Sequence, residues 1–329
     1  MRYGLPYKGS KNGIAEWVCD NLPNAQNFYD LFAGGCAITH CTMLRGKYKN
    51  YLINDISDYP QVFFDATKGK YRNETRWISR EDFFSLKDND AYIRYCWSFG
   101  NNGRSYLYSK EIEPWKKALH YARVFDDFSE FEKMGIELNS ATSKNIIRHE
   151  KELKEKYIEW YCKEVLKSDI ETETLRKNLT ENIKRNFGKS QWEFPKLKQS
   201  LERLQRLQSL ESLQRLQSLE SLQSSYEDVK IKENSVIYCD IPYKGTDGYI
   251  GEFDYKRFYE WARSQKELVI ISEYSMPNDF ICIARIEKKQ LFNSWRNSKK
   301  VVEGLFIPKH QEKLYIRKQT DLEQLLLDF

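Results

Sequence analysis

Residues Val236–Tyr243 read Val-Ile-Tyr-Cys-Asp-Ile-Pro-Tyr. The apolar, largely β-branched first half predicts a buried parallel strand, because strands covered on both faces carry near-continuous apolar runs. Asp240, Pro242 and Tyr243 follow this run, so we expect them at the carboxyl end of the strand. Open α/β sheets bind ligands at that edge. A carboxylate beside a rigid turn and an aromatic ring could hold a flat, amino-bearing ring there.

A second apolar strand is predicted near the amino end of the chain, and a glycine turn follows it. Residues 27–38 read Asn-Phe-Tyr-Asp-Leu-Phe-Ala-Gly-Gly-Cys-Ala-Ile, with Ala33-Gly34-Gly35 between the strand and a helical pattern. Glycines at such a turn let the backbone approach a ligand closely. The spacing matches neither a dinucleotide fingerprint nor a Walker phosphate loop, so the turn alone is equally compatible with tight packing and no ligand.

Asp55 lies at the end of the next predicted strand, Asn50–Ile56. An acid at the end of the second strand suits the two hydroxyls of a ribose. Taken alone, Asp55 could equally cap a helix. It does not stand alone, because the glycine turn precedes it and the Asp-Ile-Pro-Tyr of residues 240–243 follows it. This order suggests a nucleoside reagent bound beside a second ring on which it acts.

Three motifs in this order resemble those of one enzyme family. Tyr7-Lys8-Gly9-Ser10-Lys11 resembles its amino-terminal segment, Asp30-Leu31-Phe32-Ala33-Gly34-Gly35 its cofactor motif, and Asp240-Ile241-Pro242-Tyr243 its catalytic Asp-Pro-Pro-Tyr. The family is that of the Dam-type DNA adenine-N6 methyltransferases, the D12 class. Segments after the catalytic motif resemble its phage and mobile-element members. The resemblance covers roughly residues 1–60 and 226–310.

The resemblance implies an α/β, Rossmann-like methyltransferase fold that depends on S-adenosylmethionine and carries a mainly helical DNA-recognition insertion. The implied reaction methylates N6 of an adenine flipped out of double-stranded DNA, since a stacked base is out of reach. Asp240 and the main-chain carbonyl of Ile241 would accept hydrogen bonds from the amine. Pro242 would stiffen the turn and Tyr243 would stack on the ring. Such catalysis is positional and electrostatic, without a covalent enzyme intermediate.

The implied cofactor site combines residues from several motifs. The first two motifs would surround the methionine part of S-adenosylmethionine, Asp55 would bind the ribose, and the Ser225-Tyr226 segment would contact the adenine. The full expected set is Tyr7, Lys11, Asp30, Phe32, Ala33, Gly34, Gly35, Asp55, Ser225 and Tyr226.

Two positions depart from the family pattern. Ile241 replaces the first proline of the catalytic motif, which removes a fixed φ but keeps the carbonyl that the mechanism uses. Ser225 stands where relatives usually carry an aspartate that contacts the adenine of the cofactor. A serine hydrogen-bonds an amine less strongly than a charged acceptor does. We therefore expect the reaction to survive and cofactor affinity to be its weaker point.

The resemblance implies a split catalytic domain formed by residues 1–60 and 224–329. Residues 61–200 between them would form the target-recognition region. Helical patterns in that region lie near residues 110–125, 144–168 and 172–187.

A Gly-Asn-Asn-Gly-Arg run at residues 100–104 predicts a loop in the recognition region. Its amide and guanidinium groups could reach base edges and phosphates. We expect Asn101, Arg104 and, after the catalytic motif, Lys244 to contact DNA. A solvated turn over an aromatic core is the alternative for the loop.

Residues 206–214 and 215–223 are the same nine residues, Arg-Leu-Gln-Ser-Leu-Glu-Ser-Leu-Gln. Leucine recurs at every third position from Leu201 to Leu222. On a helix such leucines would wind around the axis and form neither one stripe nor a heptad seam. The pattern predicts a mobile or partly helical insertion over residues 201–223, and a self-association segment is the alternative.

Beyond the catalytic motif the sequence predicts the rest of the sheet. Strands are expected at residues 267–274, 280–286 and 312–316, and a helix at residues 254–264. The glycine-containing loop 244–252 is expected to be mobile and to close over the flipped base.

Composition is compatible with this interpretation. The net charge of +5 permits DNA binding without establishing it. The seven cysteines fall singly, which argues against zinc and for reduced intracellular thiols. Neither a signal peptide nor a membrane-length apolar run is evident, so we expect a cytoplasmic protein without an obligate protein partner.

Two other functions fit parts of the sequence. A related enzyme could methylate N4 of cytosine or act on RNA, because either amine suits similar acceptors. A catalytically silent DNA-binding module is the alternative from a different class, with Ile241 and Ser225 as signs of decay. The recognised bases and a restriction partner stay open.

Overall fold

The computed structural model describes residues 3–5, 9–71, 73–137, 150–165, 181, 217–243, 253–291 and 298–327. The chain divides into two compact units. Met1–Arg72 and Ser200–Phe329 form the first, here called the sheet unit, and Asn73–Gln199 form the second, the helical unit. The first segment of the catalytic domain was expected to end at residue 60, but it extends to residue 72. The helix Tyr59–Thr67 belongs to the sheet unit.

The sheet unit is built on seven strands in the order β3-β2-β1-β4-β5-β7-β6. The first five in this order pair in parallel, whereas β7 runs antiparallel to both of its neighbours. The strands are β1 Asn27–Asp30, β2 Asn50–Asp55, β3 Ser218–Gln223, β4 Ser235–Cys239, β5 Leu268–Glu273, β6 Phe280–Leu291 and β7 Ser298–Pro308.

This topology confirms the predicted α/β, Rossmann-like fold class. Every residue of β1, β4 and β5 is buried, as the apolar runs of β4 and β5 predict. The strand order reverses between β1 and β4, because the chain forms β2 and β3 on one side of β1 before it returns to form β4 on the other side. In open parallel sheets a ligand crevice forms at such a reversal, outside the carboxyl ends of the strands.

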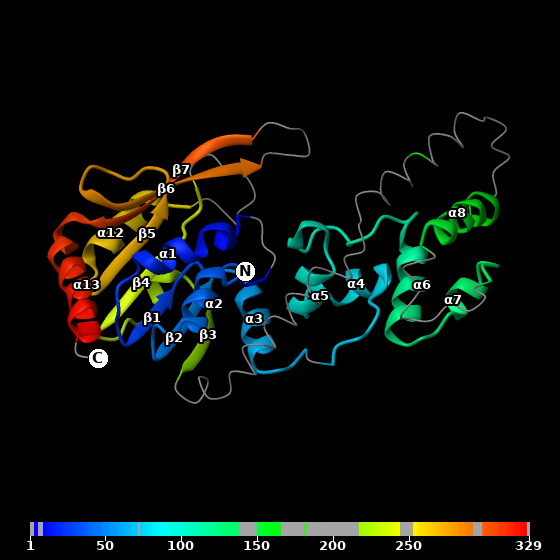
Figure 1. Cartoon of the computed structure of the whole chain (residues 1–329), viewed down its shortest axis with the longest axis horizontal. Coiled ribbons are helices and arrows are strands. Elements are labelled where there is room, and N and C mark those ends of the chain that lie inside the picture. Colours follow the sequence, from blue (N-terminus) through cyan, green and yellow to red (C-terminus); the bar gives the residue numbers. More distant parts are fainter. Residues whose placement is uncertain are drawn as a thin grey trace. The chain divides into compact units, whose positions relative to one another are not determined.

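Helices lie along the sheet (Figure 1). Their apolar faces explain the packing: Phe258 and Ala262 of α12 are buried in one cluster with Ile237 and Val269 of the sheet. The side chain of Asp254 caps α12 by accepting from the Arg257 N–H at 3.0 Å. The helical segments are η1 Lys11–Ile14, α1 Ala15–Asn21, α2 Ala37–Leu44, α3 Tyr59–Thr67, η5 Tyr226–Asp228, α12 Tyr255–Ser264, η6 Lys309–Gln311 and α13 Glu312–Leu327.

The strand predicted at residues 312–316 is wrong, because these residues begin α13. Burial follows a helical period there: Gln311 and Lys318 are buried while Ile316 is 56% exposed. Gln311 fixes the start of this helix to β5. Its side-chain oxygen accepts from the Val269 N–H at 2.9 Å, and its amide donates to the carbonyls of Gln265 and Glu267.

Part of the repeat lies in the sheet, which corrects the predicted insertion over residues 201–223. Residues 218–223 form β3 and pair with β2 over its whole length. The three-residue leucine spacing conflicts with the two-residue period of a strand, so Leu219 is buried and Leu222 is 41% exposed. An edge strand tolerates this conflict because only one face needs burial. Residues 201–216 lie outside the described residues.

The helical unit has an aromatic core. Trp115 packs edge-on against Phe131 and tilted against Tyr157, and all three are fully buried. Its described elements are α4 Arg80–Leu86, α5 Ala91–Cys96, η2 Phe99–Asn101, α6 Glu113–Val124, α7 Ser129–Glu132, α8 Glu150–Trp160 and the π-helical turn η4 Tyr161–Val165.

These elements test the helical predictions for residues 61–200. The helix predicted near 110–125 is confirmed by α6, and the described part of 144–168 is helical. Apart from residue 181, the stretch 172–187 lies outside the described residues. None of the described helices is long and apolar enough to cross a membrane.

Candidate active site

A cavity of about 330 Å³ lies where the carboxyl ends of β1, β2 and β4 meet. Most of the predicted cofactor residues line it, together with two residues of the catalytic motif. These are Lys11, Asp30, Phe32, Ala33, Gly34, Gly35, Asp55, Ser225, Tyr226, Asp240 and Pro242. The cavity therefore joins motifs that are more than two hundred residues apart in the sequence.

The glycine turn after β1 is held in a conformation that few other residues adopt. Gly34 has φ +46°, and its N–H donates to Asp55 Oδ2 at 3.0 Å. The amino-terminal segment packs directly on this turn, where Leu5 N–H donates to the Gly35 carbonyl at 2.7 Å. A Cβ on Gly4 would lie 2.2 Å from that same carbonyl oxygen, so only glycine fits there.

Asp55 belongs to the cavity wall and does not cap a helix. Its second oxygen accepts from the N–H and the hydroxyl of Ser57, both at 2.9 Å. The cap position of α3 is occupied by Asp58 instead. Burial raises the pKa of Asp55, while the hydrogen bonds from Ser57 and Gly34 oppose that shift.

Asp30 is the most deeply buried acid of the cavity. Oδ2 accepts from the Thr39 hydroxyl at 2.7 Å, whereas Oδ1 has no hydrogen-bond partner among the described residues. Burial raises the pKa of this carboxyl to about 7, and the charges of Asp240 and Asp55 add to the effect. A buried carboxylate oxygen without a donor points to a ligand that supplies one.

Asn54 connects two segments of the chain that line the cavity, the end of β1 and the segment after β3. It was not among the residues predicted from the sequence. This fully buried amide donates to the carbonyls of Leu31 and Ser224 and accepts from the Ser224 N–H and hydroxyl. The end of β1 is thereby tied to the segment after β3, which carries Ser225 and Tyr226. An asparagine at the end of an apolar strand was the only signal for it.

Two further features of the cavity wall were also missed. Ile56, directly after Asp55, is 59% exposed although it lines the cavity. Glu227 and Arg257 form an ion pair among the lining residues, at 2.6 Å between the Arg257 guanidinium and Glu227 Oε2. The Tyr226 ring packs against Phe32 with centroids 5.4 Å apart.

In the catalytic motif, Asp240 is paired with Lys11. The Lys11 ammonium donates to Asp240 Oδ1 at 2.5 Å and lies 4.0 Å from Glu303 Oε1. The Lys11 side chain is 3% exposed and that of Asp240 19%, so the acid is the more accessible of these two lining residues. Ile241 is buried in the core of the sheet unit, and this packing holds the turn where proline would otherwise stiffen it.

Tyr243 has no direct access to the cavity. Its ring is 8% exposed and stacks on Tyr274, with centroids 4.4 Å apart and planes within 12°. The Lys11 ammonium lies over the same ring, 4.6 Å from its centroid. An adenine can therefore stack on Tyr243 only if one of these neighbours moves away.

The residues predicted to contact DNA differ in whether their side-chain donors are already hydrogen-bonded within the protein. Asn101 has φ +54° and donates its side-chain amide to the Tyr95 carbonyl at 2.9 Å, so this donor serves the loop itself. Arg104 is exposed, and its guanidinium has no ion-pair partner among the described residues. Phe99 in the same loop is 70% exposed and was missed. Tyr7 and Lys244 lie outside the described residues, as does the loop 244–252.

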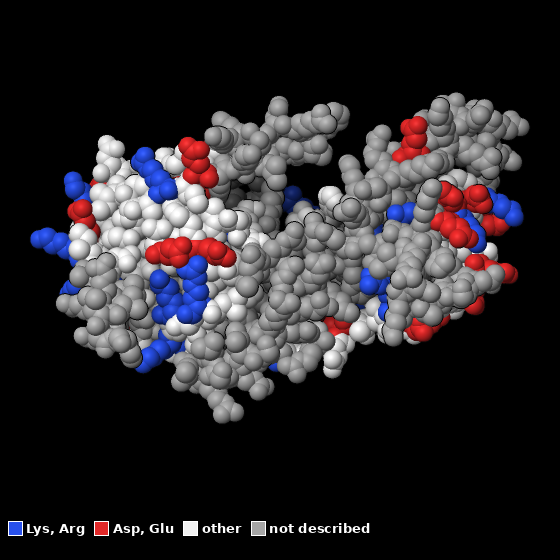
Figure 2. All heavy atoms as spheres, in the orientation of Figure 1, with Lys and Arg blue, Asp and Glu red and all other residues white. Residues whose placement is uncertain are grey.

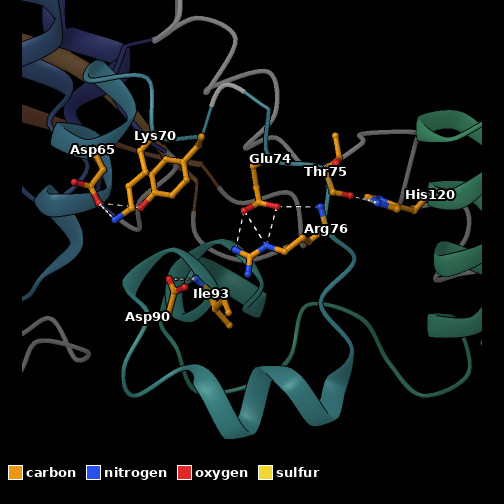
Figure 3. Close-up of polar contacts among 9 residues, drawn as sticks. Asp65, Lys70, Glu74, Thr75, Arg76, Asp90, Ile93 and His120 are labelled. Carbon is orange, nitrogen blue, oxygen red and sulfur yellow. Dashed lines mark hydrogen bonds and ion pairs between the residues drawn. The ribbon is translucent and has the colours of Figure 1, made fainter.

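Two other arginines of the helical unit are engaged in ion pairs. The Arg76 guanidinium donates to both carboxylate oxygens of Glu74, to Oε1 at 3.0 Å and to Oε2 at 2.7 Å (Figure 3). Arg80 binds Glu113 at 2.9 Å. On the drawn face of the molecule, Lys and Arg generally lie beside Asp and Glu (Figure 2). Among the described residues no cluster of His, Cys, Asp and Glu could hold a metal ion.

Fold and cavity together define an α/β protein with an acid-lined pocket at the reversal of the strand order. The model of the D12 class N6 adenine-specific DNA methyltransferases matches residues 7–313, and the chain belongs to this family. No curated protein matches the chain. The protein is an adenine-specific DNA methyltransferase, as the motifs predicted, and the family favours this activity over methylation of cytosine or RNA.

Proposed function

We propose that the cavity binds S-adenosylmethionine and that, once Tyr274 has moved off the Tyr243 ring, Asp240, Ile241 and Tyr243 present the N6 amine of a flipped adenine to it. The observation that carries this proposal is the presence of Asp240 in the same cavity as Asp30 and Asp55. These acids come from three strands of the sheet and meet at its reversal point. Bound S-adenosylmethionine would supply a methyl group activated by a sulfonium centre.

The charges of the cavity support a cationic cofactor. S-adenosylmethionine carries an ammonium and a sulfonium group. The cavity is lined by five acids, Asp30, Asp55, Glu227, Asp240 and Asp254, against two bases, Lys11 and Arg257. Asp30 Oδ1, which has no donor among the described residues, suits the ammonium group. Asp55, already oriented by Gly34 and Ser57, suits the ribose hydroxyls. Ser225, Tyr226 and the exposed Ile56 would surround the adenine ring.

Lys11 orients the acceptor for the target amine. By donating to Asp240 Oδ1 it fixes the plane of the carboxylate. Hydrogen bonds from the amine to Asp240 and to the Ile241 carbonyl would localise the nitrogen lone pair on the side facing the methyl group. Positioned acceptors of this kind act through orientation and electrostatics.

Double-stranded DNA is the proposed partner, with Arg104 and Phe99 of the helical unit among its contacts. An exposed arginine can bind phosphates, and an exposed aromatic ring can enter a base step or stack on an unpaired base. We further propose that the protein acts in the cytoplasm.

Calorimetric titration of S-adenosylmethionine tests the cofactor assignment. Wild-type protein should bind it, and Asp55→Ala should weaken binding at least tenfold because two ribose hydrogen bonds are lost. Glu267→Gln, at the opposite end of β4 and β5, is the matched control and should bind like the wild type. Unchanged affinity in the Asp55 variant would remove the ribose from this position.

A further inference from the structure

The hydroxyl of Tyr243 is bound by an acid that none of the sequence motifs contains. It donates to Glu303 Oε1 of β7 at 2.5 Å, and the Ser272 hydroxyl of β5 donates to the same oxygen at 2.7 Å. The Lys11 ammonium is 4.0 Å from this oxygen. Glu303 is fully buried.

All three neighbours are donors, so the carboxylate acts as the acceptor of the group. Burial raises the pKa of Tyr243, and the charges of Asp240 and Glu303 raise it further, so the phenol keeps its proton. The Ser272 hydroxyl donates to the same Glu303 oxygen, and the Lys11 ammonium lies 4.0 Å from it. Glu303 therefore links the catalytic motif to both β5 and the amino-terminal motif.

Stability is a poor reason for a carboxylate in this place. The desolvation of one buried ion costs several kcal/mol, and replacing buried ionic groups by packed apolar residues is often neutral or stabilising. What a buried carboxylate with several donors does provide is a fixed orientation for each of them. Here two of the donors belong to the proposed active site.

The charge count points the same way. The Lys11 ammonium lies between two carboxyl groups, those of Asp240 and Glu303, so with both ionised the three groups together have a net charge of −1. Methyl transfer places positive charge on the N6 nitrogen of the target. With Glu303 neutral, Lys11 would cancel Asp240 and leave no net negative charge beside that nitrogen.

We propose that Glu303 is a positioning residue of the methyl-transfer reaction. Its carboxylate fixes the rotation of the Tyr243 ring and acts as the second counter-charge of Lys11, which leaves the charge of Asp240 available to the target amine. This inference rests on the proposed roles of Asp240 and Tyr243.

A double-mutant cycle with Glu303→Gln and Tyr243→Phe tests the proposal. Glutamine keeps an acceptor for the two hydroxyls but drops the charge, and phenylalanine keeps the ring but drops the hydroxyl. We expect Glu303→Gln to lower kcat about tenfold or more while the Kd for S-adenosylmethionine stays within about twofold. The double variant should be slower than Glu303→Gln by much less than the factor lost in Tyr243→Phe alone.

Glu267→Gln is the control for a changed carboxylate elsewhere in the sheet, and it should turn over like the wild type. Thermal unfolding of all variants gives a second cycle that needs no activity. Coupling in unfolding without coupling in kcat would mean that the contact is only structural and would overturn the proposal. The proposal would also be overturned if the fold-loss in kcat of the double variant equalled the product of the losses in the two single variants.

Ser272→Ala provides a second test should Glu303→Gln not fold. It removes one donor to Oε1 and leaves the charge and the ring in place, so we expect a small kcat loss that is non-additive with Tyr243→Phe. If the kcat losses of Ser272→Ala and Tyr243→Phe multiply in the double variant, the proposal is again contradicted. A wild-type protein that binds the cofactor but transfers no methyl group to adenine would instead refute the proposed function itself.

Discussion

The buried environment of Asp30 disfavours the ionised form of its carboxyl group. Burial raises the pKa of this carboxyl from 3.8 to about 7. Between these pH values the folded state holds a proton that the unfolded state has lost, so the contribution of Asp30 to stability declines as the pH rises through this window. A bound ammonium group would lower the pKa of Asp30, because it favours the ionised carboxylate, and would thereby offset this loss of stability.

Asp30→Asn should therefore separate stability from binding. Without cofactor at pH 8 we expect the variant to be more stable than the wild type by up to about 4 kcal/mol, the value of roughly three pKa units. The advantage should shrink as the pH falls from 7 to 4. Binding of S-adenosylmethionine should weaken at least tenfold, because a charged acceptor is lost. Thermal unfolding across pH and calorimetric titration measure the two effects; a variant that binds normally would contradict the assignment.

Single residues of the site were predictable only where short motifs carry them. Asp30, Gly34, Asp55 and Asp240 each follow an apolar strand, so sequence order alone places them at one edge of a parallel sheet. The Tyr243–Glu303 contact spans sixty residues and depends on how β7 is positioned beside β5, which no local pattern specifies.

At the scale of elements, β3 shows how a strand can arise in a sequence that looks like an insertion. Its six residues, Ser-Leu-Glu-Ser-Leu-Gln, occur at 218–223 and again at 209–214. Because the copies are identical and adjacent, deleting 206–214 or 215–223 gives the same protein. Either deletion leaves one complete strand sequence directly before Ser224.

Deletion of one copy should consequently leave the site intact. We expect β3 and the Asn54–Ser224 hydrogen bonds to form as before, with a melting temperature within a few degrees and cofactor affinity within about twofold of the wild type. Deletion of both copies, 206–223, is the contrasting variant. It removes the strand, exposes the edge of β2 and should abolish cofactor binding. Equal behaviour of the two deletions would show that β3 does not support the cavity.

The other error among the elements has a comparable cause. Leu-Tyr-Ile at residues 314–316 has the composition of a strand, yet it lies in α13. Pro308 ends β7, and the buried Gln311 anchors the chain to β5 so that a helix begins. Tertiary anchoring of this kind overrides a short apolar run.

At the scale of the whole molecule, the family match extends over both units, whereas the cavity belongs to the sheet unit alone. Binding to DNA phosphates requires basic side chains that are not already paired with acids. Arg76 and Arg80 are occupied by Glu74 and Glu113, and the net charge of +5 is modest. Arg104 is the exposed arginine that the sequence and the structure both favour.

Arg104→Ala should weaken DNA binding about equally for different sequences if the arginine contacts a phosphate. The slope of log K against log salt concentration should then fall by about one. Arg76→Ala is the matched control, since its guanidinium is bound to Glu74. Fluorescence anisotropy with labelled duplexes at several salt concentrations measures both variants. An unchanged slope for Arg104→Ala would exclude a phosphate contact.

Transfer of a labelled methyl group from S-adenosylmethionine to adenine in double-stranded DNA tests the central claim most directly, with Asp240→Ala beside the wild type. Glu303 remains as a counter-charge for Lys11 in this variant, which favours folding. We expect label on adenine N6 with the wild type and with the exposed-acid control Asp228→Ala. Asp240→Ala should lose about a thousandfold in rate at nearly unchanged cofactor affinity. Undiminished transfer by Asp240→Ala would contradict the account.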